Sequence, residues 1–342
     1  MPDLAALGWD DAWDASFRPY REEGLLPGRV AVPHRGAYDV LTEAGDARAR
    51  VAGRFRHGAT RTELPVVGDW VALDPAARTI QAVLPRRTTF ARRAPHDAAG
   101  ARQQVVAANL DVVFVVSPLG GDVNIQLLER YLTLAWESGA RPVILLTKAD
   151  LEPNPDAIAA DVAVAGGVPV VAVSARTGFG LESVRSHLGP GVTGALLGPS
   201  GAGKSRLVNA LVGEEVVATG DLTTRGEGRH TTTRRQLVAL PGGGLLVDNP
   251  GMREVHLWLA DEGLEDAFPD IADLETKCRF SDCSHESEPG CAIRTALAEG
   301  TLAPERWQSY RGLRRELAEL EERLARTERL RARRKGPGAE AS

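Results

Sequence analysis

Apolar residues between positions 110 and 200 gather in short unbroken runs, and these runs alternate with stretches of helical spacing. An unbroken run such as Val112-Val113-Phe114-Val115-Val116 is typical of a strand that is covered on both faces. Alternating strands and helices predict a parallel sheet with helices on both sides, and such sheets bind ligands at the carboxyl ends of their strands. The predicted strands are 110–116, 142–146, 168–173 and 194–197, and the predicted helices are 125–136, 158–164 and 181–188.

The segment from residue 28 to about residue 87 has shorter β-like runs separated by turn residues. This pattern predicts a small barrel, and an OB-type barrel, which often binds nucleic acid across one face, is the natural candidate. The expected strands are 29–32, 37–41, 49–55, 69–73 and 79–84. Before them, the spacing of Trp9, Trp13 and Phe17 predicts a short amphipathic helix that packs on a neighbour.

A basic cluster follows the last of these runs, with Arg86, Arg87, Arg92 and Arg93 on either side of Phe90. An aromatic residue among arginines is a composition that favours contact with a nucleic-acid backbone. A solvated linker is the alternative, and the residues alone do not decide between the two.

The end of the chain, after about residue 261, is predicted to be helical. It finishes with a long charged segment whose apolar stripe is Leu313, Leu317, Leu320 and Leu324. Much of this segment has the pattern of a salt-bridged, solvated helix, while its last turns, from Arg329 to Lys335, are basic enough to favour RNA phosphate.

Length and charge limit the class of protein. A chain of 342 residues is expected to form two or three domains, and a formal net charge of −5 means that any nucleic-acid contact must come from local basic patches. No apolar run approaches the length of a membrane span, and the first residues do not read as a secretory signal. We therefore expect a cytoplasmic protein with no membrane partner.

A glycine-rich stretch lies between the apolar run 194–197 and an amphipathic run that starts at Leu207. The order strand, glycine-rich loop and helix is the context that a phosphate-binding loop requires. We predict that its backbone N–H groups surround a polyphosphate, that Lys204 contacts the outer phosphates, and that the Ser205 hydroxyl binds Mg²⁺. The stretch is Gly198, Pro199, Ser200, Gly201, Ala202, Gly203, Lys204 and Ser205.

Two further motifs end predicted strands. Thr147-Lys148-Ala149-Asp150 resembles the NKxD element of GTPases, in which the carboxylate accepts guanine N1–H and the exocyclic amine. Ser174-Ala175 resembles the accessory loop that contacts guanine O6 through a backbone N–H. Thr147 stands where Asn is usual and has a shorter side chain, so we expect weaker guanine affinity with unchanged selectivity.

The predicted strands 236–240 and 245–247 lead to Asp248-Asn249-Pro250-Gly251, which resembles the DxxG element. We expect Asp248 to hold the Mg²⁺ water shell and the Gly251 N–H to meet the terminal phosphate. In ordinary GTPases the phosphate loop precedes the DxxG element, the base reader and Ser-Ala. Here the base reader and Ser-Ala come first, which predicts a circularly permuted domain. A permutation of this kind is permissible because domain termini tend to lie close together.

The three cysteines of the chain lie together with a histidine in the pattern Cys278-x4-Cys283-x-His285-x5-Cys291. A disulfide framework is not expected from an odd number of cysteines in a reducing compartment. Three thiolates and one imidazole make a closed tetrahedral site, so we predict one structural Zn²⁺ per chain.

Taken together, the barrel, the permuted motifs, the Cys/His cluster and the string Gly228-Arg229-His230-Thr231-Thr232-Thr233 resemble the ribosome small-subunit-dependent GTPase A family (RsgA). The resemblance implies GTP hydrolysis that is stimulated by the small ribosomal subunit during its late maturation. It also implies a multidomain fold with an N-terminal OB barrel, a central permuted P-loop GTPase and a C-terminal, mostly helical zinc domain. The expected divisions are an extension at 1–27, the OB-fold RNA-binding domain at 28–104, the GTPase domain at 105–261 and the zinc-binding domain at 262–342.

Catalysis needs a residue that positions water, and Met252 occupies the place where a Gln usually does so. We therefore predict His230 as the catalytic residue beside Lys204, and Thr232 among its threonine neighbours as the Mg²⁺ ligand. The expected partners are GTP or GDP, the small subunit and its rRNA, for a monomeric protein. The alternative is a GTP-dependent RNA- or protein-binding switch on another complex, with incidental hydrolysis.

Overall fold

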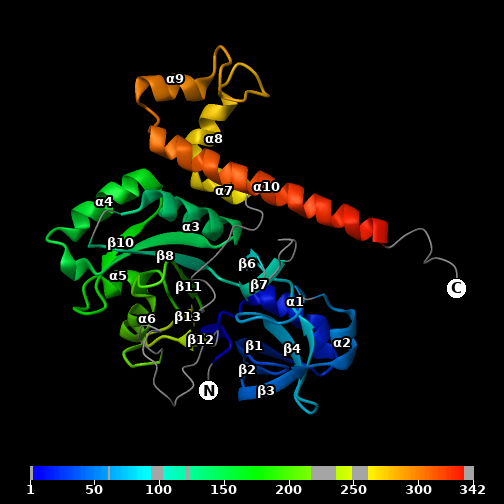
Figure 1. Ribbon diagram of the computed structural model, residues 1–342. Helices are drawn as coiled ribbons and strands as arrows, with labels where there is room; N and C mark the ends of the chain where they lie inside the picture. Colours follow the sequence, from blue (N-terminus) through cyan, green and yellow to red (C-terminus); the bar gives the residue numbers. More distant parts are fainter. Residues whose placement is uncertain are drawn as a thin grey trace, which may run out of the picture. The chain divides into compact units, whose positions relative to one another are not determined.

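A computed structural model describes most of the chain and divides it into two compact units (Figure 1). The described residues are 3–60, 62–93, 103–120, 123–216, 236–248 and 261–334. The first unit comprises Met1–Ala91, Gln104–Val123 and Ser138–Val255, and the second comprises Arg92–Gln103, Asn124–Glu137 and His256–Ser342. No helix among the described residues is long and apolar enough to cross a membrane.

The N-terminal part of the first unit contains a closed five-stranded barrel, as predicted, with strand order β1-β2-β3-β5-β4. Val30, Val40, Val71 and Ile80 are fully buried in its core, because alternate residues of each strand face inward. The strands are β1 (Leu26–Pro33), β2 (Tyr38–Thr42), β3 (Gly45–Val51), β4 (Trp70–Asp74) and β5 (Thr79–Val83).

The predicted strand 49–55 is too long. Strand β3 ends at Val51, the last residue that pairs with β5, and the chain then turns into the short helix α2 (Gly53–Gly58). The Arg56 N–H donates to the carbonyl of Ala52 at 2.9 Å, so the backbone hydrogen bonds of this segment become local instead of passing to a neighbouring strand.

The N-terminal extension packs as its aromatic spacing predicts. A 3₁₀ turn (η1, Ala5–Leu7) precedes helix α1 (Asp11–Glu22), which buries Trp13 and Phe17. The ring of Trp9 lies edge-on to Trp70 of β4, with ring centroids 4.7 Å apart. This aromatic contact ties the extension to the barrel.

Two arginines of the basic cluster are engaged internally. Arg86 makes a bidentate pair with the buried Asp69, with both N–O distances at 2.8 Å. Arg87 pairs with Asp10 of the extension and lies over the ring of Trp13 at 4.2 Å. Both guanidinium groups therefore have an acidic partner within the protein, and phosphate contact at these two positions stays a prediction. The strand that follows, β6 (Thr89–Arg93), forms a two-stranded sheet with β7 (Gln103–Ala108).

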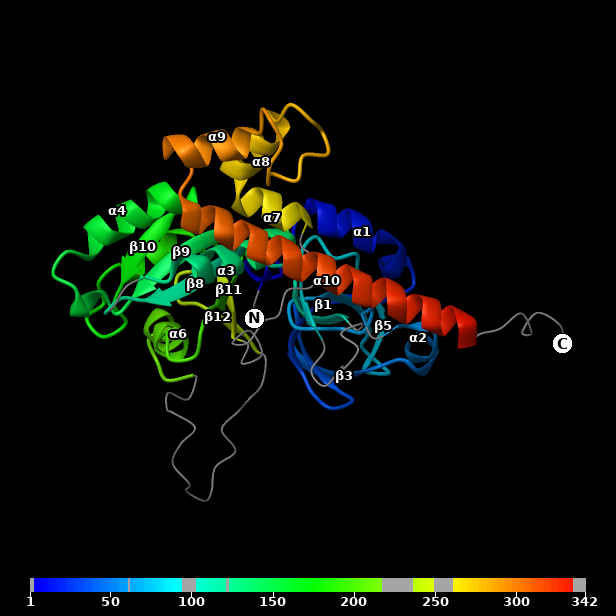
Figure 2. The ribbon, with the colours of Figure 1, turned by 45° about the horizontal axis from the view of Figure 1, so that its top comes forward.

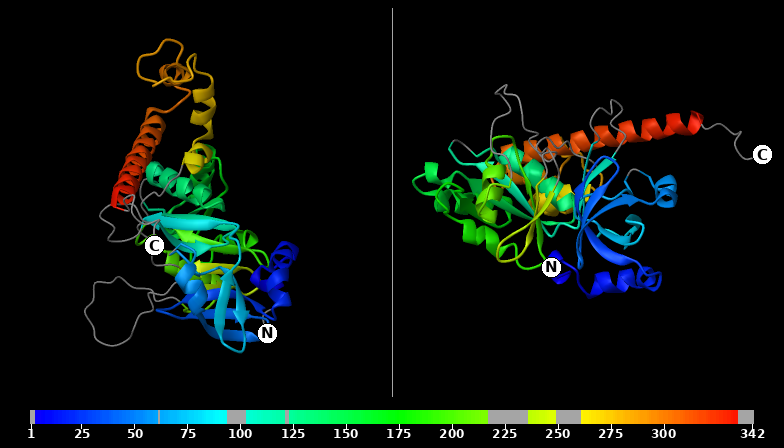
Figure 3. Two further views of the ribbon diagram at one scale, coloured as in Figure 1. Left: turned by 90° about the vertical axis from the view of Figure 1, so that its right-hand side faces the viewer. Right: turned by 90° about the horizontal axis from the view of Figure 1, so that it is seen from below.

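The rest of the first unit is built on a sheet that Figure 3 shows from two further sides. The sheet has six strands in the order β10-β9-β8-β11-β13-β12. All neighbours pair in parallel except β12, which runs antiparallel to β13. The carboxyl ends of the other strands therefore share one edge. The strands are β8 (Val112–Pro118), β9 (Arg141–Thr147), β10 (Val170–Val173), β11 (Thr193–Leu197), β12 (Gln236–Ala239) and β13 (Leu245–Asp248).

Both faces of this sheet are buried, which explains its unbroken apolar runs. Helices α5 (Leu181–Ser186) and α6 (Lys204–Val212) contribute Val184, Leu207 and Val208 to the core on one face. Residues of the opposite face, such as Val113 and Val115, are equally buried, and α4 (Pro155–Gly166) packs on β10.

Strand β11 lies in the middle of the sheet, and the strands on its two sides come from different parts of the sequence. Strands β8, β9 and β10 precede it in sequence and lie on one side, while β13 and β12 follow it and lie on the other. This is the arrangement that the permuted order of the motifs predicts.

The second unit is helical, and the long helix α10 is its main element (Figure 2). Arg130 of α3 makes a bidentate pair with Glu316 of α10 at 2.7 and 2.8 Å. Gly263 of α7 approaches α3 so closely that a Cβ there would lie 2.6 Å from the carbonyl of Thr133, so the two backbones meet at a residue without a side chain. The helices are α3 (Ile125–Glu137), α7 (Asp261–Ala267), α8 (Pro269–Thr276), α9 (Ala292–Glu299) and α10 (Pro304–Arg334).

The predicted apolar stripe of the last helix is present where its side chains are described. Leu313 and Leu317 are buried, with 6% and 2% of their surface exposed. The side chains of Leu320 and Leu324 lie outside the described part.

Candidate functional site

The glycine-rich loop joins the central strand β11 to helix α6, at the edge of the sheet where the parallel strands end. Gly201 and Gly203 have φ angles of 77° and 89°, in the left-handed region that favours glycine. A Cβ on Gly198 would lie 2.3 Å from the carbonyl oxygen of Val116. The loop therefore owes its tight curl to its glycines.

Lys204 and Ser205 form the first turn of α6, where free backbone N–H groups favour an anion. The Lys204 ammonium donates to the carbonyls of Gly198 and Pro199, both at 2.6 Å. The charge thus lies directly over the loop. Its role toward a phosphate, and that of the neighbouring Ser205 hydroxyl, remain predictions.

The base-reader residues lie at the carboxyl ends of β9 and β10. Asp150 belongs to a 3₁₀ turn (η2, Ala149–Leu151) after Lys148, and Ser174 follows β10 directly. The Ser174 hydroxyl donates to Asp150 Oδ1 at 2.5 Å, and Arg176 Nε lies 3.0 Å from Oδ2. The hydroxyl contact and then the nearby guanidinium lower the pKa of Asp150, so at neutral pH it is an ionised acceptor in a fixed orientation.

Thr147 links the base reader to the phosphate loop. Its hydroxyl donates to the carbonyl of Ala202 at 2.6 Å, and the side chain is buried. The Thr147 hydroxyl has one hydrogen to donate, and this bond uses it. An Asn side chain at this position would have two N–H donors. The substitution therefore keeps a connection to the loop.

Asp248 ends β13 beside the central strand, where its backbone pairs with Gln236 of β12. Its position at the shared edge is consistent with the predicted Mg²⁺ role. The other predicted participants, His230, Thr232 and Gly251, lie outside the described residues, as do Thr231 and Thr233, and their roles stay predictions.

A group of metal-binding side chains lies between α8 and α9 in the second unit. Each of the four residues offers one ligand atom, and these atoms lie within 4.8 Å of one another: Cys278, Cys283, His285 and Cys291. Tetrahedral zinc with S and N ligands needs donor atoms separated by about 3.5–4 Å. Three thiols and an imidazole whose ligand atoms lie within 4.8 Å of one another can hold a metal ion.

The local backbone presents these ligands inward. His285 has a φ of 63°, which few residues other than glycine adopt, and this turns its Nδ1 toward Cys278 Sγ (3.6 Å) and Cys291 Sγ (3.5 Å). Cys291 caps α9, and its sulfur accepts the N–H of Arg294 at 3.5 Å. Burial, followed by the neighbouring thiols, raises the pKa of Cys283 to about 11, so binding of a cation there displaces a proton.

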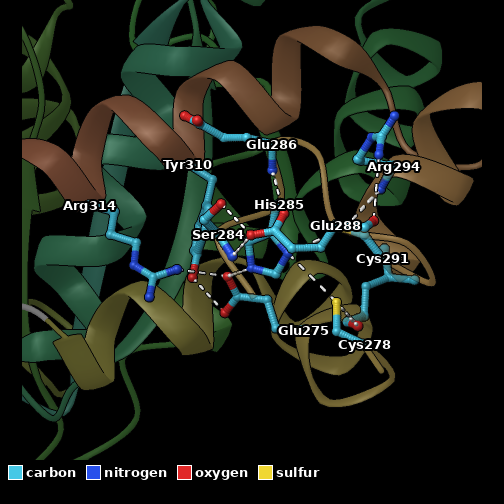
Figure 4. A network of polar contacts seen from close by, with 11 residues as sticks. Glu275, Cys278, Ser284, His285, Glu286, Glu288, Cys291, Arg294, Tyr310 and Arg314 are labelled. Atoms are coloured by element: carbon cyan, nitrogen blue, oxygen red, sulfur yellow. Dashed lines mark hydrogen bonds and ion pairs between the residues drawn. The ribbon is translucent and has the colours of Figure 1, made fainter. Parts of the chain in front are cut away.

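Sequence reasoning missed the carboxylate behind the histidine. Glu275, on the last turn of α8, lies with Oε1 3.2 Å from His285 Nε2, as Figure 4 shows. The same carboxylate accepts a hydrogen bond from the Tyr310 hydroxyl at 3.0 Å and pairs with Arg314 at 2.7 Å. Burial and the Glu275 charge raise the pKa of Tyr310 to about 12, so it remains a donor at neutral pH. No local motif marks Glu275, because its partners come from a distant part of the chain.

The second feature that sequence reasoning missed is a basic pocket on the barrel with a volume of about 730 Å³. Arg48 lies 3.7 Å from Asp39, and the other four guanidinium groups have no ion pair with any described residue. The arginines that line the pocket are Arg35, Arg48, Arg50, Arg56 and Arg78. Such a group of free cations is the local patch that an acidic chain needs to contact phosphates.

Comparison with known proteins agrees with this arrangement. A family model described as RsgA GTPase matches residues 83–258. The small ribosomal subunit biogenesis GTPase RsgA of Opitutus terrae is 47% identical, over 95% of this chain and 94% of that protein. The protein of the same name from Streptomyces coelicolor is 48% identical, over 92% and 86% of the two chains.

Two solved structures share the fold. The crystal structure of YjeQ from Thermotoga maritima is 27% identical and matches with a TM-score of 0.65, over 86% of this chain and 99% of that chain. The structure of YloQ, a circularly permuted GTPase, matches with a TM-score of 0.63 over 86% of this chain and 96% of that chain. At 24% identity the second likeness concerns the fold alone.

Proposed function

Because the chain belongs to the RsgA GTPase family, we propose that it hydrolyses GTP under stimulation by the small ribosomal subunit, late in the maturation of that subunit. The observation that carries this proposal is the common edge of the sheet, where the phosphate loop and an oriented carboxylate lie together. The names of the two relatives, which refer to biogenesis of the small subunit, support the choice of partner.

Guanine is selected by Asp150 in this proposal. An ionised carboxylate accepts both guanine N1–H and the exocyclic amine, whereas adenine does not offer this pair of donors. The hydrogen bond from Ser174 holds the carboxylate in place, the Lys148 stem lies on the base, and the Ala175 N–H contacts O6. The phosphates occupy the loop from Gly198 to Gly203, with Lys204 on the outer phosphates.

Catalysis is assigned to Lys204 and His230, with His230 orienting the attacking water in place of the usual Gln. Ser205, Asp248 and Thr232 hold Mg²⁺, which neutralises charge on the outer phosphates when bound. If His230→Ala leaves subunit-stimulated turnover unchanged while Lys204→Ala abolishes it, the role of His230 is wrong.

We propose that the metal at Cys278, Cys283, His285 and Cys291 is Zn²⁺, one per chain, and that its role is structural. A site closed by four protein ligands leaves no position for a substrate. Elemental analysis of protein purified without chelator tests both the metal and its stoichiometry.

The barrel pocket supports the proposal of rRNA as the direct contact. Its unpaired arginines suit a phosphate backbone, and neutralised phosphates make such binding strongly dependent on salt. We further propose that the protein acts as a monomer in the cytoplasm, and sedimentation at micromolar concentration tests the monomeric state.

The decisive experiment measures GTP turnover with and without purified small subunits, with large subunits as the control. Stimulation by small subunits alone is the expected result. Binding of GTP without stimulation by either subunit would favour a GTP-dependent switch on another RNA or protein complex.

A further inference from the structure

The imidazole of His285 is held on both sides. Its Nδ1 faces the sulfurs of Cys278 and Cys291, and its Nε2 faces Glu275 Oε1 at 3.2 Å. With Nδ1 toward the thiols, the ring proton belongs on Nε2, where it donates to the carboxylate. The His285 side chain is only 7% exposed, so water does not replace this contact easily.

Glu275 is placed against the preference of its own helix. It lies in the last turn of α8, where the carbonyl end of the helix disfavours a negative charge. Three donors compensate: His285 Nε2, the Tyr310 hydroxyl at 3.0 Å and Arg314 at 2.7 Å. Two of them come from α10, so the carboxylate joins the metal ligand to a separate helix.

Helix α10 also reaches the histidine directly. Trp307, one turn before Tyr310, lies edge-on to the His285 ring, with centroids 5.6 Å apart and an interplanar angle of 89°. The rings of Trp307 and Tyr310 stack on each other, also at 5.6 Å. Trp307, Tyr310 and Arg314 are spaced by three and four residues, so one face of α10 supplies all three contacts.

We propose that Glu275 is a positioning residue that fixes His285 as an Nδ1 ligand and couples metal binding to the docking of α10. Metal binding needs the imidazole in this orientation, and the carboxylate that orients it is itself oriented by Tyr310 and Arg314. Because coupling is reciprocal, the docked helix strengthens metal binding by the same factor by which the metal strengthens docking. This inference rests on the proposed metal role of the four ligands.

The test compares Glu275→Ala and Glu275→Gln with a matched control, Glu286→Ala. Glu286 is an exposed residue on the loop that carries the metal ligands, and its carboxylate lies 3.5 Å from Arg311 of α10. Among the described residues, no hydrogen bond or ion pair joins this carboxylate to the His285 ring. For each full-length variant we would measure Zn²⁺ affinity by chelator competition, the absorption spectrum of the Co²⁺-substituted protein, and amide exchange along α10.

Glu275→Ala is expected to weaken Zn²⁺ affinity about 10- to 100-fold, to change the Co²⁺ spectrum, and to raise amide exchange around Tyr310 in the metal-loaded protein. Glu275→Gln keeps an oxygen acceptor for Nε2–H and should lie between Glu275→Ala and the wild type. The double variant Tyr310→Phe/Arg314→Ala leaves Glu275 in place and should still weaken metal affinity, because the carboxylate loses its orientation.

Wild-type affinity and spectrum for Glu275→Ala would overturn the positioning role. An equal loss in Glu286→Ala would also overturn it, because the effect would then be one of general loop charge. Unchanged metal affinity in the double variant would refute the coupling to α10. Failure of the wild-type protein to bind Zn²⁺ or Co²⁺ would instead refute the proposed metal site, so the two outcomes are distinguishable.

Discussion

The described residues that are expected to bind nucleotide are spread between Thr147 and Asp248, and they meet because parallel strands end at one edge of a sheet. The four candidate metal ligands, in contrast, lie between Cys278 and Cys291 on one continuous loop. The first site takes its geometry from the large buried core of the sheet, whereas within the loop 278–291 of the second site Cys291 is the one buried residue. The two sites should therefore respond differently to substitution. Loss of a nucleotide contact should leave the fold of the sheet intact, whereas loss of a metal ligand should unfold the segment around it.

The largest effect that tests this comparison is removal of the metal. Metal binding is worth about 10–16 kcal/mol in small zinc domains, so we expect Cys291→Ser or strong chelation to unfold the region of α8 and α9. The sheet has its own core, and GTP affinity should change less than about twofold. Amide exchange and nucleotide titration on the same sample measure both effects.

Ser287→Ala, a neighbouring change on the same loop that removes no ligand, is the control and should behave as wild type. A parallel loss of GTP binding on chelation would show that the two sites share one folding unit.

Asp150→Asn should give the next largest effect. Each hydrogen bond to a charged acceptor contributes about 1.5–3 kcal/mol, and two are affected, so GTP affinity should fall about 100-fold or more. XTP, which offers a carbonyl to the new amide, should bind better than it does to the wild type. Titration with both nucleotides measures the change in selectivity, and the exposed Asp156→Asn on α4 is the matched control.

Thr147→Val removes a hydroxyl and nearly conserves shape. The Ala202 carbonyl then loses its donor, and a hydrogen bond of about 1 kcal/mol predicts that GTP and GDP affinity both fall about 5- to 10-fold. The ratio of GTP to XTP affinity should not move, because Asp150 is untouched. Thr147→Ser retains the hydroxyl and should bind normally; equal weakening of both variants would assign the effect to packing.

Glu288→Gln should produce the smallest change. The Glu288 carboxylate accepts the Ser284 hydroxyl at 2.5 Å and three backbone N–H groups of the metal loop, and the hydroxyl contact is the largest cause that lowers its pKa to about 2. A lowered pKa means that its contribution is complete above the ordinary value of 4.5 and is lost only as pH falls toward 2.

Between pH 5 and 8 the Glu288 carboxylate should therefore stay ionised, and the protection of the loop amides against exchange should not change with pH because of it. The glutamine variant should exchange the Ser284 and Ser287 amides slightly faster throughout this range. A pH-dependent difference between the two proteins there would contradict the ionised state of the carboxylate.

The sequence could predict those features that depend on residues close together in the chain. The phosphate loop and the cysteine spacing are contiguous, and the unbroken apolar runs report burial of both strand faces, so the sheet, the loop and the metal cluster could be anticipated. Glu275 could not be, because its partners Tyr310 and Arg314 come from a helix more than thirty residues away, with separations of 35 and 39.

The sequence was also unable to predict which arginines have an ion-pair partner. Arg86 and Arg87 looked available beside Phe90, yet they pair with Asp69 and Asp10, from other segments. The arginines of the barrel pocket come from separate elements: Arg48 and Arg50 lie on β3, Arg56 lies on α2, and the other two lie in turns, so no contiguous run marked them as a group. Charge can be counted along a chain, but whether a guanidinium has a partner is decided by the fold.

The pairing of α3 with the last helices bears on how the protein is made. Arg130 and its partner Glu316 are 186 residues apart, and Gly263, which contacts the backbone of α3, is also far downstream. At the usual synthesis rate of about 5–20 residues per second, Arg130 is added to the chain roughly 10–40 s before Glu316. The second unit is therefore completed only near the end of translation, and a nascent chain can finish its barrel long before it can build the surface that α3 shares with α10.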